Sequence, residues 1–163
     1  MKRIIKKIKD EATAIRIGKF MTGPNTFDQT WAPNEKKYIE KAPLVSLKNS
    51  NHQYWYIEED GEIIGAIGVR ENKYGSSGYE MDADYLAIHK QYRRIGLGRL
   101  LLKEMENFVK KKKGRYIHIL TCDIASYKPA RCFWIKNNYK KVCEIPDYYV
   151  EGEGRVDYLK KLI

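Results

Sequence analysis

A short basic segment with two glycines has the residue types of a phosphate-binding loop. An expected strand runs into it, an expected long helix follows it, and its residues are Arg93-Arg94-Ile95-Gly96-Leu97-Gly98-Arg99. The first turn of a helix carries backbone N–H groups without partners and a partial positive charge, and glycines allow the backbone to approach a phosphate closely. The arginines add further positive charge. We therefore expect the amides of this segment to hold a diphosphate.

The spacing of the glycines excludes two common kinds of phosphate site. The segment lacks the Gly-x-x-x-x-Gly-Lys-Ser/Thr pattern of a P-loop, which argues against a nucleoside triphosphatase. It also lacks the three-glycine fingerprint of dinucleotide-binding folds, and no regular series of alternating strands and helices follows it. Two glycines alone would also fit a tight turn between a strand and a helix, so the surrounding residues decide the interpretation.

Three carboxylates alternate along the segment that leads into this loop. Glu80, Asp82 and Asp84 share one face of a strand expected over 79–89, unless a bulge intervenes. An alkyl ammonium group with a pKa of about 10 must lose a proton before its nitrogen can attack an acyl group, and a carboxylate can accept that proton. The same face could instead attract a cationic amine, or lie in solvent as charged strand faces often do.

The positive charge of the chain is unevenly distributed. The formal net charge is +10, and the stretch from His89 to Tyr116 holds ten cations and two acids, so ten minus two gives +8 there. Such a local excess indicates an anionic partner, which could be a phosphate-rich cofactor or a nucleic acid. Aromatic residues at 54–56 and at Tyr116 could stack bases. The clustering of cations around a glycine loop favours the cofactor and argues against nucleic acid, although the lysine run that closes the stretch also fits a solvated helix end.

Hydrophobic periodicity and turn residues predict the elements that position these groups. Asn34 is expected to cap the second helix and Pro43 to lie beyond its end, and Asp60-Gly61 is expected to turn a hairpin. The expected helices span 10–20, 34–42, 97–113 and 129–138, and the expected strands span 53–58, 62–70, 79–89, 116–122, 141–145 and 156–159. This order predicts an α/β (α+β) layered fold, a single domain over 1–163 with a mixed, mostly antiparallel central sheet flanked by helices.

The stretch from Asp84 to Leu101 resembles the core motif of the GCN5-related N-acetyltransferase (GNAT) family. That motif reads Gln/Arg-x-x-Gly-x-Gly/Ala after a strand end like Leu-Ala-Val, and Arg93, Gly96 and Gly98 satisfy it after Leu-Ala-Ile. The resemblance extends to the hairpin before the motif and to the strand and helix after it. It covers nearly the whole chain, less securely over the first fifty residues.

The resemblance implies a fold, a co-substrate and a reaction. The implied fold is the GNAT acyl-CoA N-acyltransferase fold, and the implied reaction is direct attack of a primary amine on acetyl-CoA in a ternary complex, without a metal. In such enzymes the fourth strand splays from the fifth, and the pantetheine arm pairs with the backbone at positions that match Leu86, Ala87 and Ile88. The amides from Arg93 to Arg99 match the pyrophosphate cradle, and the N–H of Ile88 matches the oxyanion donor.

The helix after the fifth expected strand departs from the family pattern. Where the family commonly has the tyrosine that protonates the departing thiolate, this chain has Trp134, and Tyr127 stands where relatives have a cofactor-binding asparagine. An indole cannot be that acid, so Tyr127, Tyr148 or Tyr149 substitutes for it, or water does. Asp82 and Asp84 match positions at which relatives carry the base.

The acceptor amine is not specified by the sequence. Its site is expected from the segment 22–31, the first two helices and the segment 148–154, with the following contacts: Trp31, Glu80, Tyr148 and Tyr149. The tyrosine pair resembles the end of ribosomal-protein and other N-terminal acetyltransferases. Peptide N-termini, lysine side chains, polyamines and aminoglycosides remain open.

Composition limits the cellular setting and leaves two other functions open. No apolar run approaches the ~20 residues of a membrane span, and three cysteines without paired metal-ligand spacing favour a reduced, cytoplasmic protein with no membrane partner. A homodimer is compatible with the sequence. The alternatives to an enzyme are a basic nucleic-acid-binding module and a catalytically degenerate sensor of the same fold that binds CoA.

Overall fold

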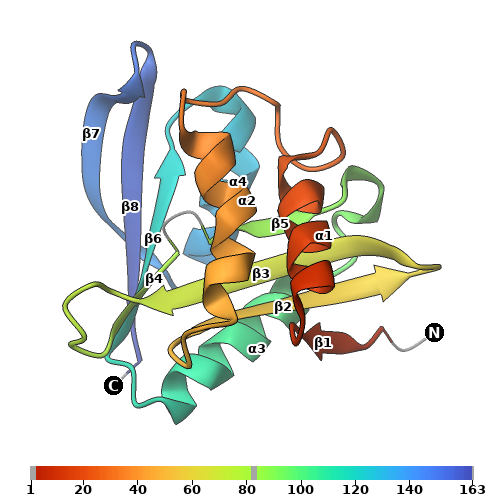
Figure 1. Ribbon diagram of the computed structural model, residues 1–163. Helices are drawn as coiled ribbons and strands as arrows, with labels where there is room; N and C mark the ends of the chain where they lie inside the picture. The colour runs from red at the N-terminus through yellow and green to blue at the C-terminus, as the bar shows by residue number, and fades with distance from the viewer. Residues whose placement is uncertain (1–2, 82–83, 163) are drawn as a thin grey trace.

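The computed structural model describes residues 3–81 and 84–162, which form one curved sheet covered by helices (Figure 1). The sheet has eight strands in the order β1-β2-β3-β4-β6-β8-β7, and β5 pairs with β3 off this path. The strands are β1 Ile5–Lys7, β2 His52–Glu59, β3 Glu62–Glu71, β4 Gly78–Glu80, β5 Leu86–Ile88, β6 Tyr116–Cys122, β7 Lys140–Val150 and β8 Glu153–Lys161. Only β4 and β6 pair in parallel among these strands, which confirms the expected mixed, mostly antiparallel sheet.

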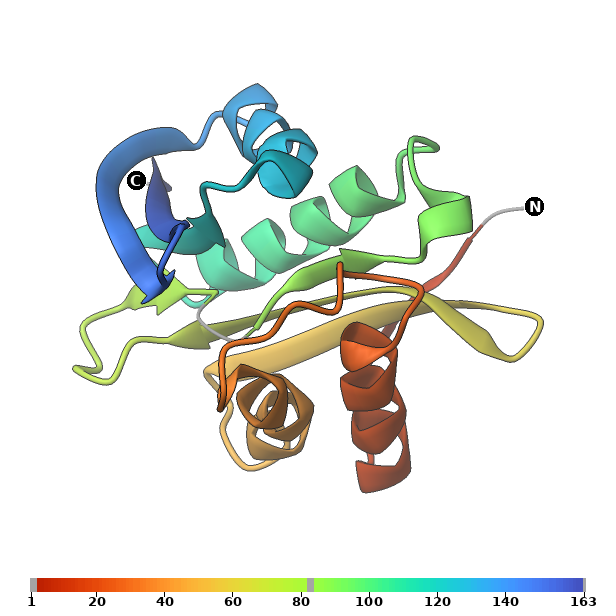
Figure 2. The ribbon, with the colours of Figure 1, turned by 90° about the horizontal axis from the view of Figure 1, so that it is seen from above.

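Helices cover both faces of the sheet, as the view from above shows (Figure 2). α1 Glu11–Thr22 and α2 Glu35–Ser46 lie on one face, and α3 Leu97–Lys111 and α4 Lys128–Lys136 lie on the other. Two hydrophobic clusters fill the spaces between the layers, one on each side of the sheet. No helix within the described part of the chain is long and apolar enough to cross a membrane.

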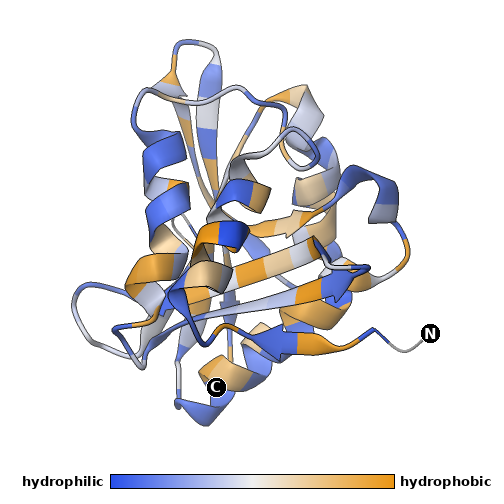
Figure 3. Ribbon diagram, turned by 45° about the vertical axis from the view of Figure 1, so that its right-hand side comes forward, coloured by the Kyte–Doolittle hydropathy of each residue, from blue (hydrophilic) through white to orange (hydrophobic). Residues whose placement is uncertain are grey.

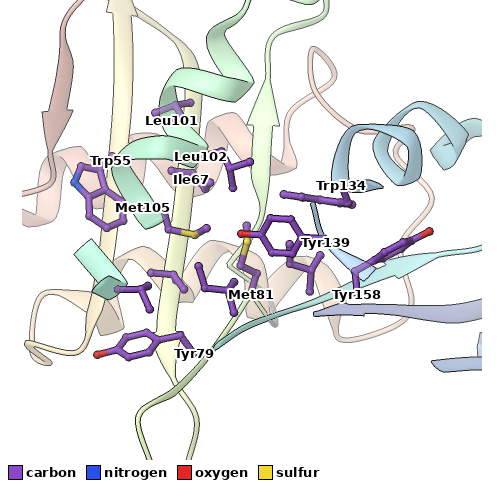
Figure 4. Packing of buried hydrophobic residues seen from close by; sticks show 14 of the residues in the cluster. Trp55, Ile67, Tyr79, Met81, Leu101, Leu102, Met105, Trp134, Tyr139 and Tyr158 are labelled. Atoms are coloured by element: carbon purple, nitrogen blue, oxygen red, sulfur yellow. The ribbon is translucent and has the colours of Figure 1, made fainter. Parts of the chain in front are cut away.

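The long helix α3 carries its apolar residues at helical spacing and buries them against the sheet. Hydrophobic and hydrophilic residues both recur along α3 (Figure 3), as expected for an amphipathic helix. Its buried residues are Leu97, Leu101, Leu102, Met105 and Val109. Leu101, Leu102 and Met105 point toward Ile67 of β3 in the core (Figure 4), so α3 is held firmly over the sheet and its first turn has a defined place.

Two predicted boundaries are wrong for reasons of packing. The second helix continues through Pro43 to Ser46, because Ile39, Ala42, Pro43 and Ser46 are buried together on one side of it, and the Ser46 hydroxyl donates to the Pro43 carbonyl at 2.6 Å. Asn34 occupies the N-cap position without a side-chain capping bond. The two closing strands are longer than predicted and form a hairpin, β7 and β8, whose outer strand is exposed and therefore lacks a clear period-2 pattern.

The expected continuous strand over 79–89 is broken into β4 and β5. Both pieces pair with β3: Arg70 lies opposite Glu80, and Ile67 lies opposite Leu86. Three steps along β3, from 70 to 67, thus correspond to six steps on the other side, from 80 to 86. The three extra residues interrupt the ladder, so Glu80 and Asp84 do not belong to one continuous strand with a regular alternation of faces.

Candidate active site

The candidate pocket lies where β5 and β6 separate from each other, beyond the break between β4 and β5. β4 pairs with β6 up to Glu80 and His118, whereas β5 pairs with β3 on its other side. The pocket therefore reaches between Leu86 of β5 and the end of β6. Its lining residues are Phe27, Asp28, Thr30, Trp31, Glu35, Met81, Tyr85, Leu86, Ile119, Leu120, Thr121, Cys122, Ile124, Tyr127, Ala130, Trp134, Tyr149 and Glu153.

The backbone of β5 presents hydrogen-bonding groups to this gap. His89 N–H donates to the Ile64 carbonyl, and Gly68 N–H donates to the Tyr85 carbonyl. Antiparallel strands alternate between residues that bond to the partner and residues that face away from it. Because of this alternation, the N–H groups of Leu86 and Ile88 point away from β3, whereas the N–H group of Ala87 points toward it. Two of the three predicted positions are thus available to an added, amide-bearing arm, and Ala87 is not.

The loop before α3 has the backbone conformation that a phosphate cradle requires. Gly96 is the N-cap of α3 with φ 90°, and Arg94 is also left-handed with φ 63°. A Cβ added at Gly98 would lie 3.4 Å from the Phe133 ring and 3.7 Å from the Leu86 side chain, so the missing side chain keeps open the space between α3, α4 and β5. These features fit the phosphate and pantetheine parts of CoA.

Arg93 holds this loop in place through carbonyl groups of the chain. Its Nε donates to the Ile88 carbonyl at 3.2 Å, and its Nη2 donates to the Thr26 carbonyl. The Arg93 side chain is therefore used for positioning, while Arg94 and Arg99 are exposed around the first turn of α3.

The basic stretch does not form one patch. The lysine run from Lys110 to Lys113 lies at the C-terminal end of α3, about 20 Å along the helix from its first turn. Only the arginines near the first turn contribute directly to the candidate phosphate site, so the excess of +8 overstates the charge there. The run is exposed, as expected for a solvated helix end.

Aromatic rings form one wall of the pocket. Phe27 stacks on Tyr127, with ring centroids 6.5 Å apart, and meets Trp31 and Tyr85 edge to face. The Tyr127 hydroxyl donates to Oδ1 of Asp28 at 3.4 Å. Burial, and then the Asp28 carboxylate, raise the pKa of Tyr127 well above its usual range. The phenol therefore stays protonated at neutral pH.

Asp84 lies inside the protein and not in the pocket. Its carboxylate is fully buried, accepts a hydrogen bond from Nε2 of His52 at 2.6 Å and forms an ion pair with Arg70. This arrangement argues against Asp84 as a general base, because both oxygens are occupied and no amine can reach them. Asp84 lies in the interior because the predicted strand is interrupted between β4 and β5. Asp82 lies outside the described residues.

The other predicted contacts divide between the pocket and the surface. Trp31 and Tyr149 line the pocket, whereas Tyr148 and Glu80 do not. The Tyr148 hydroxyl accepts a hydrogen bond from Arg155 at 3.0 Å and its ring stacks under the Arg155 guanidinium, which leaves it unsuited to protonate a group in the pocket. Trp134 is buried and also lines the pocket, and its rings meet Phe133 and Tyr139 edge to face. Figure 4 shows Trp134 beside Tyr139.

Three carboxylates line the pocket that sequence reasoning did not single out. Asp28 comes from the loop before α2, Glu35 from its first turn and Glu153 from the start of β8. The described residues that line the pocket include no lysine, arginine or histidine. The only signal in the sequence was that all three fall in or near segments expected to form the acceptor site. Their convergence could not be predicted, because it depends on strands and loops that are distant in the chain.

Comparison with known proteins agrees with this geometry. Residues 20–139 match the sequence profile of the Acetyltransferase (GNAT) family. The chain belongs to the GNAT family of acetyltransferases. It is 29% identical over 114 residues to an uncharacterized N-acetyltransferase of Methanocaldococcus jannaschii, a match that covers 66% of this chain and spans 65% of the length of that curated relative.

Solved structures show the same fold. A GNAT-family acetyltransferase from Desulfovibrio desulfuricans superposes with a TM-score of 0.81 at 17% identity, over 99% of this chain and all of that one. An aminoglycoside 6'-N-acetyltransferase complexed with coenzyme A superposes with a TM-score of 0.77 at 16% identity, over 98% of this chain and 97% of that one. At these identities the likeness concerns the fold, which confirms the predicted GNAT architecture.

Proposed function

We propose that this GNAT acetyltransferase transfers the acetyl group of acetyl-CoA to a primary amine. The observation that carries the proposal is the polarity of the pocket. On one side the pocket reaches Leu86 of β5, and Gly98 in the arginine-flanked first turn of α3 lies close to the Leu86 side chain; these two elements suit an anionic co-substrate with an amide-bearing arm. The other side has three carboxylates and, among its described lining residues, no cation, which suits an ammonium group.

The residues that would hold the co-substrate follow from these contacts. The N–H groups of Leu86 and Ile88 suit the pantetheine arm, and the amides from Arg94 to Arg99 suit the pyrophosphate. Acetyl-CoA supplies a thioester carbonyl as the electrophile. The Ile88 N–H, which faces the gap, suits the negative charge that develops on that carbonyl oxygen, and the Tyr127 hydroxyl suits protonation of the leaving thiolate.

The binding of CoA is tested by a pair of matched glycine variants. Gly96 has φ 90° and Gly61 has φ 81°, and a Cβ added at either would meet nothing within 4 Å. Alanine at either position should therefore lower the free energy of unfolding by a similar amount, roughly 1–2 kcal/mol, because a residue with a side chain is strained in the left-handed conformation. Gly96 begins α3 at the proposed cradle, whereas Gly61 lies in the turn of the β2–β3 hairpin.

We expect similar losses of thermal stability in Gly96→Ala and Gly61→Ala, measured by thermal unfolding without CoA. Isothermal titration with CoA should give wild-type affinity for Gly61→Ala and at least a tenfold weaker affinity for Gly96→Ala. Equal CoA affinities in the two variants, or no heat of binding to the wild type at millimolar CoA, would contradict the proposed site.

Turnover separates an acetyltransferase from a CoA sensor. Wild-type protein with acetyl-CoA is assayed for thiol release with spermidine, kanamycin, a lysine-containing peptide with a blocked N-terminus and a peptide with a free N-terminal alanine. Acetylation of at least one acceptor, verified by mass spectrometry, supports the proposal. CoA binding without turnover of any acceptor in a broadened amine panel would refute it and favour the sensor.

A further inference from the structure

Glu35 is held by two uncharged hydrogen-bond partners. Its Oε2 accepts a hydrogen bond from Ala32 N–H at 2.9 Å, and its Oε1 lies 3.4 Å from the hydroxyl of Tyr85. Neither partner is a cation, and within residues 3–81 and 84–162 Glu35 forms no ion pair. By contrast, Asp84 and Asp157 each bind an arginine and a histidine.

The position of Glu35 puts this unneutralised carboxylate beside the β5–β6 gap. It is half-buried at the first turn of α2 and lines the same pocket as Leu86 of β5 and the end of β6. The Ala32 and Tyr85 contacts fix the carboxylate from two sides. A fixed, partly desolvated carboxylate near the acyl-transfer position is what proton transfer from a bound amine requires.

The electrostatic surroundings of Glu35 suit a proton acceptor. Burial is the largest cause that raises its pKa, and the carboxylates of Glu153 and Asp28 raise the pKa further, while the hydrogen bonds from Ala32 and Tyr85 oppose the shift. Tyr127 of the same wall has a raised pKa and stays neutral, so it adds no charge beside Glu35 at neutral pH. A raised pKa narrows the difference between this carboxyl and an ammonium group, so proton transfer becomes less uphill.

We propose that Glu35 is the general base of the transfer reaction, and that Asp28 and Glu153 select acceptors that enter as cations. The inference rests on the proposed acetyltransferase function. It gives Glu35 the role of general base that the sequence had assigned to Asp82 or Asp84. The base comes from the acceptor-side helix α2 and not from the strand that leads to the cofactor loop.

The proton and electron balance of the step is complete. The acceptor ammonium loses one proton to the Glu35 carboxylate, which frees the nitrogen lone pair. The nitrogen forms a bond to the acetyl carbonyl carbon, and the carbon–sulfur bond breaks with its electron pair going to sulfur. The attacking nitrogen loses a second proton, the sulfur gains one, and Glu35 releases its proton to solvent. The products are an acetylated amine and CoA thiol.

The test is Glu35→Gln in the full chain, assayed with acetyl-CoA and the best acceptor found in the wild-type panel. Glutamine keeps an oxygen that can accept from Ala32 N–H, so the fold of α2 is retained. We expect kcat to fall by about 10²–10⁴ with KM changed less than threefold. We also expect the rate of the variant to go on rising with pH beyond the wild-type plateau, because only amine that is already neutral in solution reacts.

Matched variants separate the base from general negative charge. Asp28→Asn and Glu153→Gln remove the same charge from the same pocket, and we expect each to raise KM for the acceptor more than it lowers kcat. Glu35→Asp, which keeps a carboxylate, should recover part of the lost kcat. A Glu35→Gln enzyme with kcat within threefold of wild type, or three neutralised variants with the same kinetic profile, would overturn the assignment.

The same experiment distinguishes this inference from the function on which it rests. CoA titration of Glu35→Gln should give wild-type affinity, because Glu35 lies on the acceptor side of the pocket. Active wild type with an active Glu35→Gln variant overturns only the base. A wild type that binds CoA and acetylates no amine overturns the acetyltransferase proposal itself.

Discussion

Replacing Asp84 with asparagine tests whether this residue is a buried structural charge or a catalytic base. Asp84 is fully buried between His52 and Arg70, whose side chains are 2% and 27% exposed. Asparagine has nearly the same shape, but it can accept only one of the two hydrogen bonds through its oxygen. Its NH₂ group would then face either the guanidinium of Arg70 or the ring of His52.

The expected loss of stability follows from these contacts. Breaking a buried ion pair on one side costs about 3–5 kcal/mol, and a hydrogen bond to a charged group contributes about 1.5–3 kcal/mol. Arg70 can still reach solvent, so we expect a value near the lower end, about 3 kcal/mol. For a chain of this length that corresponds to a fall in Tm of roughly 6–12 °C.

The comparison variant is Asp157→Asn, because Asp157 also binds an arginine and a histidine, Arg155 and His118. The side chain of His118 is 22% exposed, so water can replace part of the hydrogen bonding that the substitution removes. We therefore expect Asp157→Asn to lower the free energy of unfolding by about 1–2 kcal/mol. Both variants are measured by urea unfolding, and kcat is expressed per folded molecule. A loss below 1 kcal/mol in Asp84→Asn refutes the structural reasoning. A stable variant with a changed pH–rate profile would restore Asp84 as a base.

Two further predictions concern pH and the proton donor. Burial alone raises the pKa of Asp157, but hydrogen bonds from Arg155 and His118 outweigh it and leave the pKa below its usual value. A lowered pKa in the folded state stabilises the protein at pH values above the unfolded-state pKa of about 4, and this stabilisation is lost as the pH falls through the folded-state pKa. The midpoint of urea unfolding should therefore drop more steeply between about pH 6 and pH 3 for the wild type than for Asp157→Asn. Tyr127→Phe should lower kcat by about 10–100-fold with CoA affinity retained, and because the raised pKa of Tyr127 keeps it protonated, the basic limb of the pH–rate profile should be unchanged. An unaltered kcat would exclude Tyr127 as the donor.

The family, and the elements that form the candidate co-substrate site, could be predicted from local sequence. The arginine–glycine segment, the helix that begins at Leu97 and the Leu-Ala-Ile strand before it are contiguous, and their conformations depend on near neighbours. Gly96 needs its left-handed φ for the same local reason. The hairpin through Asp60 and Gly61 was likewise predictable, since both residues adopt the positive φ of its turn.

The acceptor side could not be predicted in the same way. A period-2 pattern puts Glu80 and Asp84 on one face, but three extra residues relative to β3 break the strand, and Asp84 joins His52 and Arg70 in the interior. That interruption is set by pairing with β3 and not by the residues of the interrupted segment itself. Register shifts of this kind leave no unambiguous local signal.

The sequence by itself determined the loop that suits a diphosphate, the helix that carries it and the family. Only the tertiary structure decided which charges meet. It separated the lysine run from the loop by the length of α3, used the Arg93 side chain to hold carbonyl groups, and brought Asp28, Glu35 and Glu153 to one pocket. The physical reason is that backbone conformation near a glycine is local, whereas burial and the distance between charges depend on which distant segments pack together.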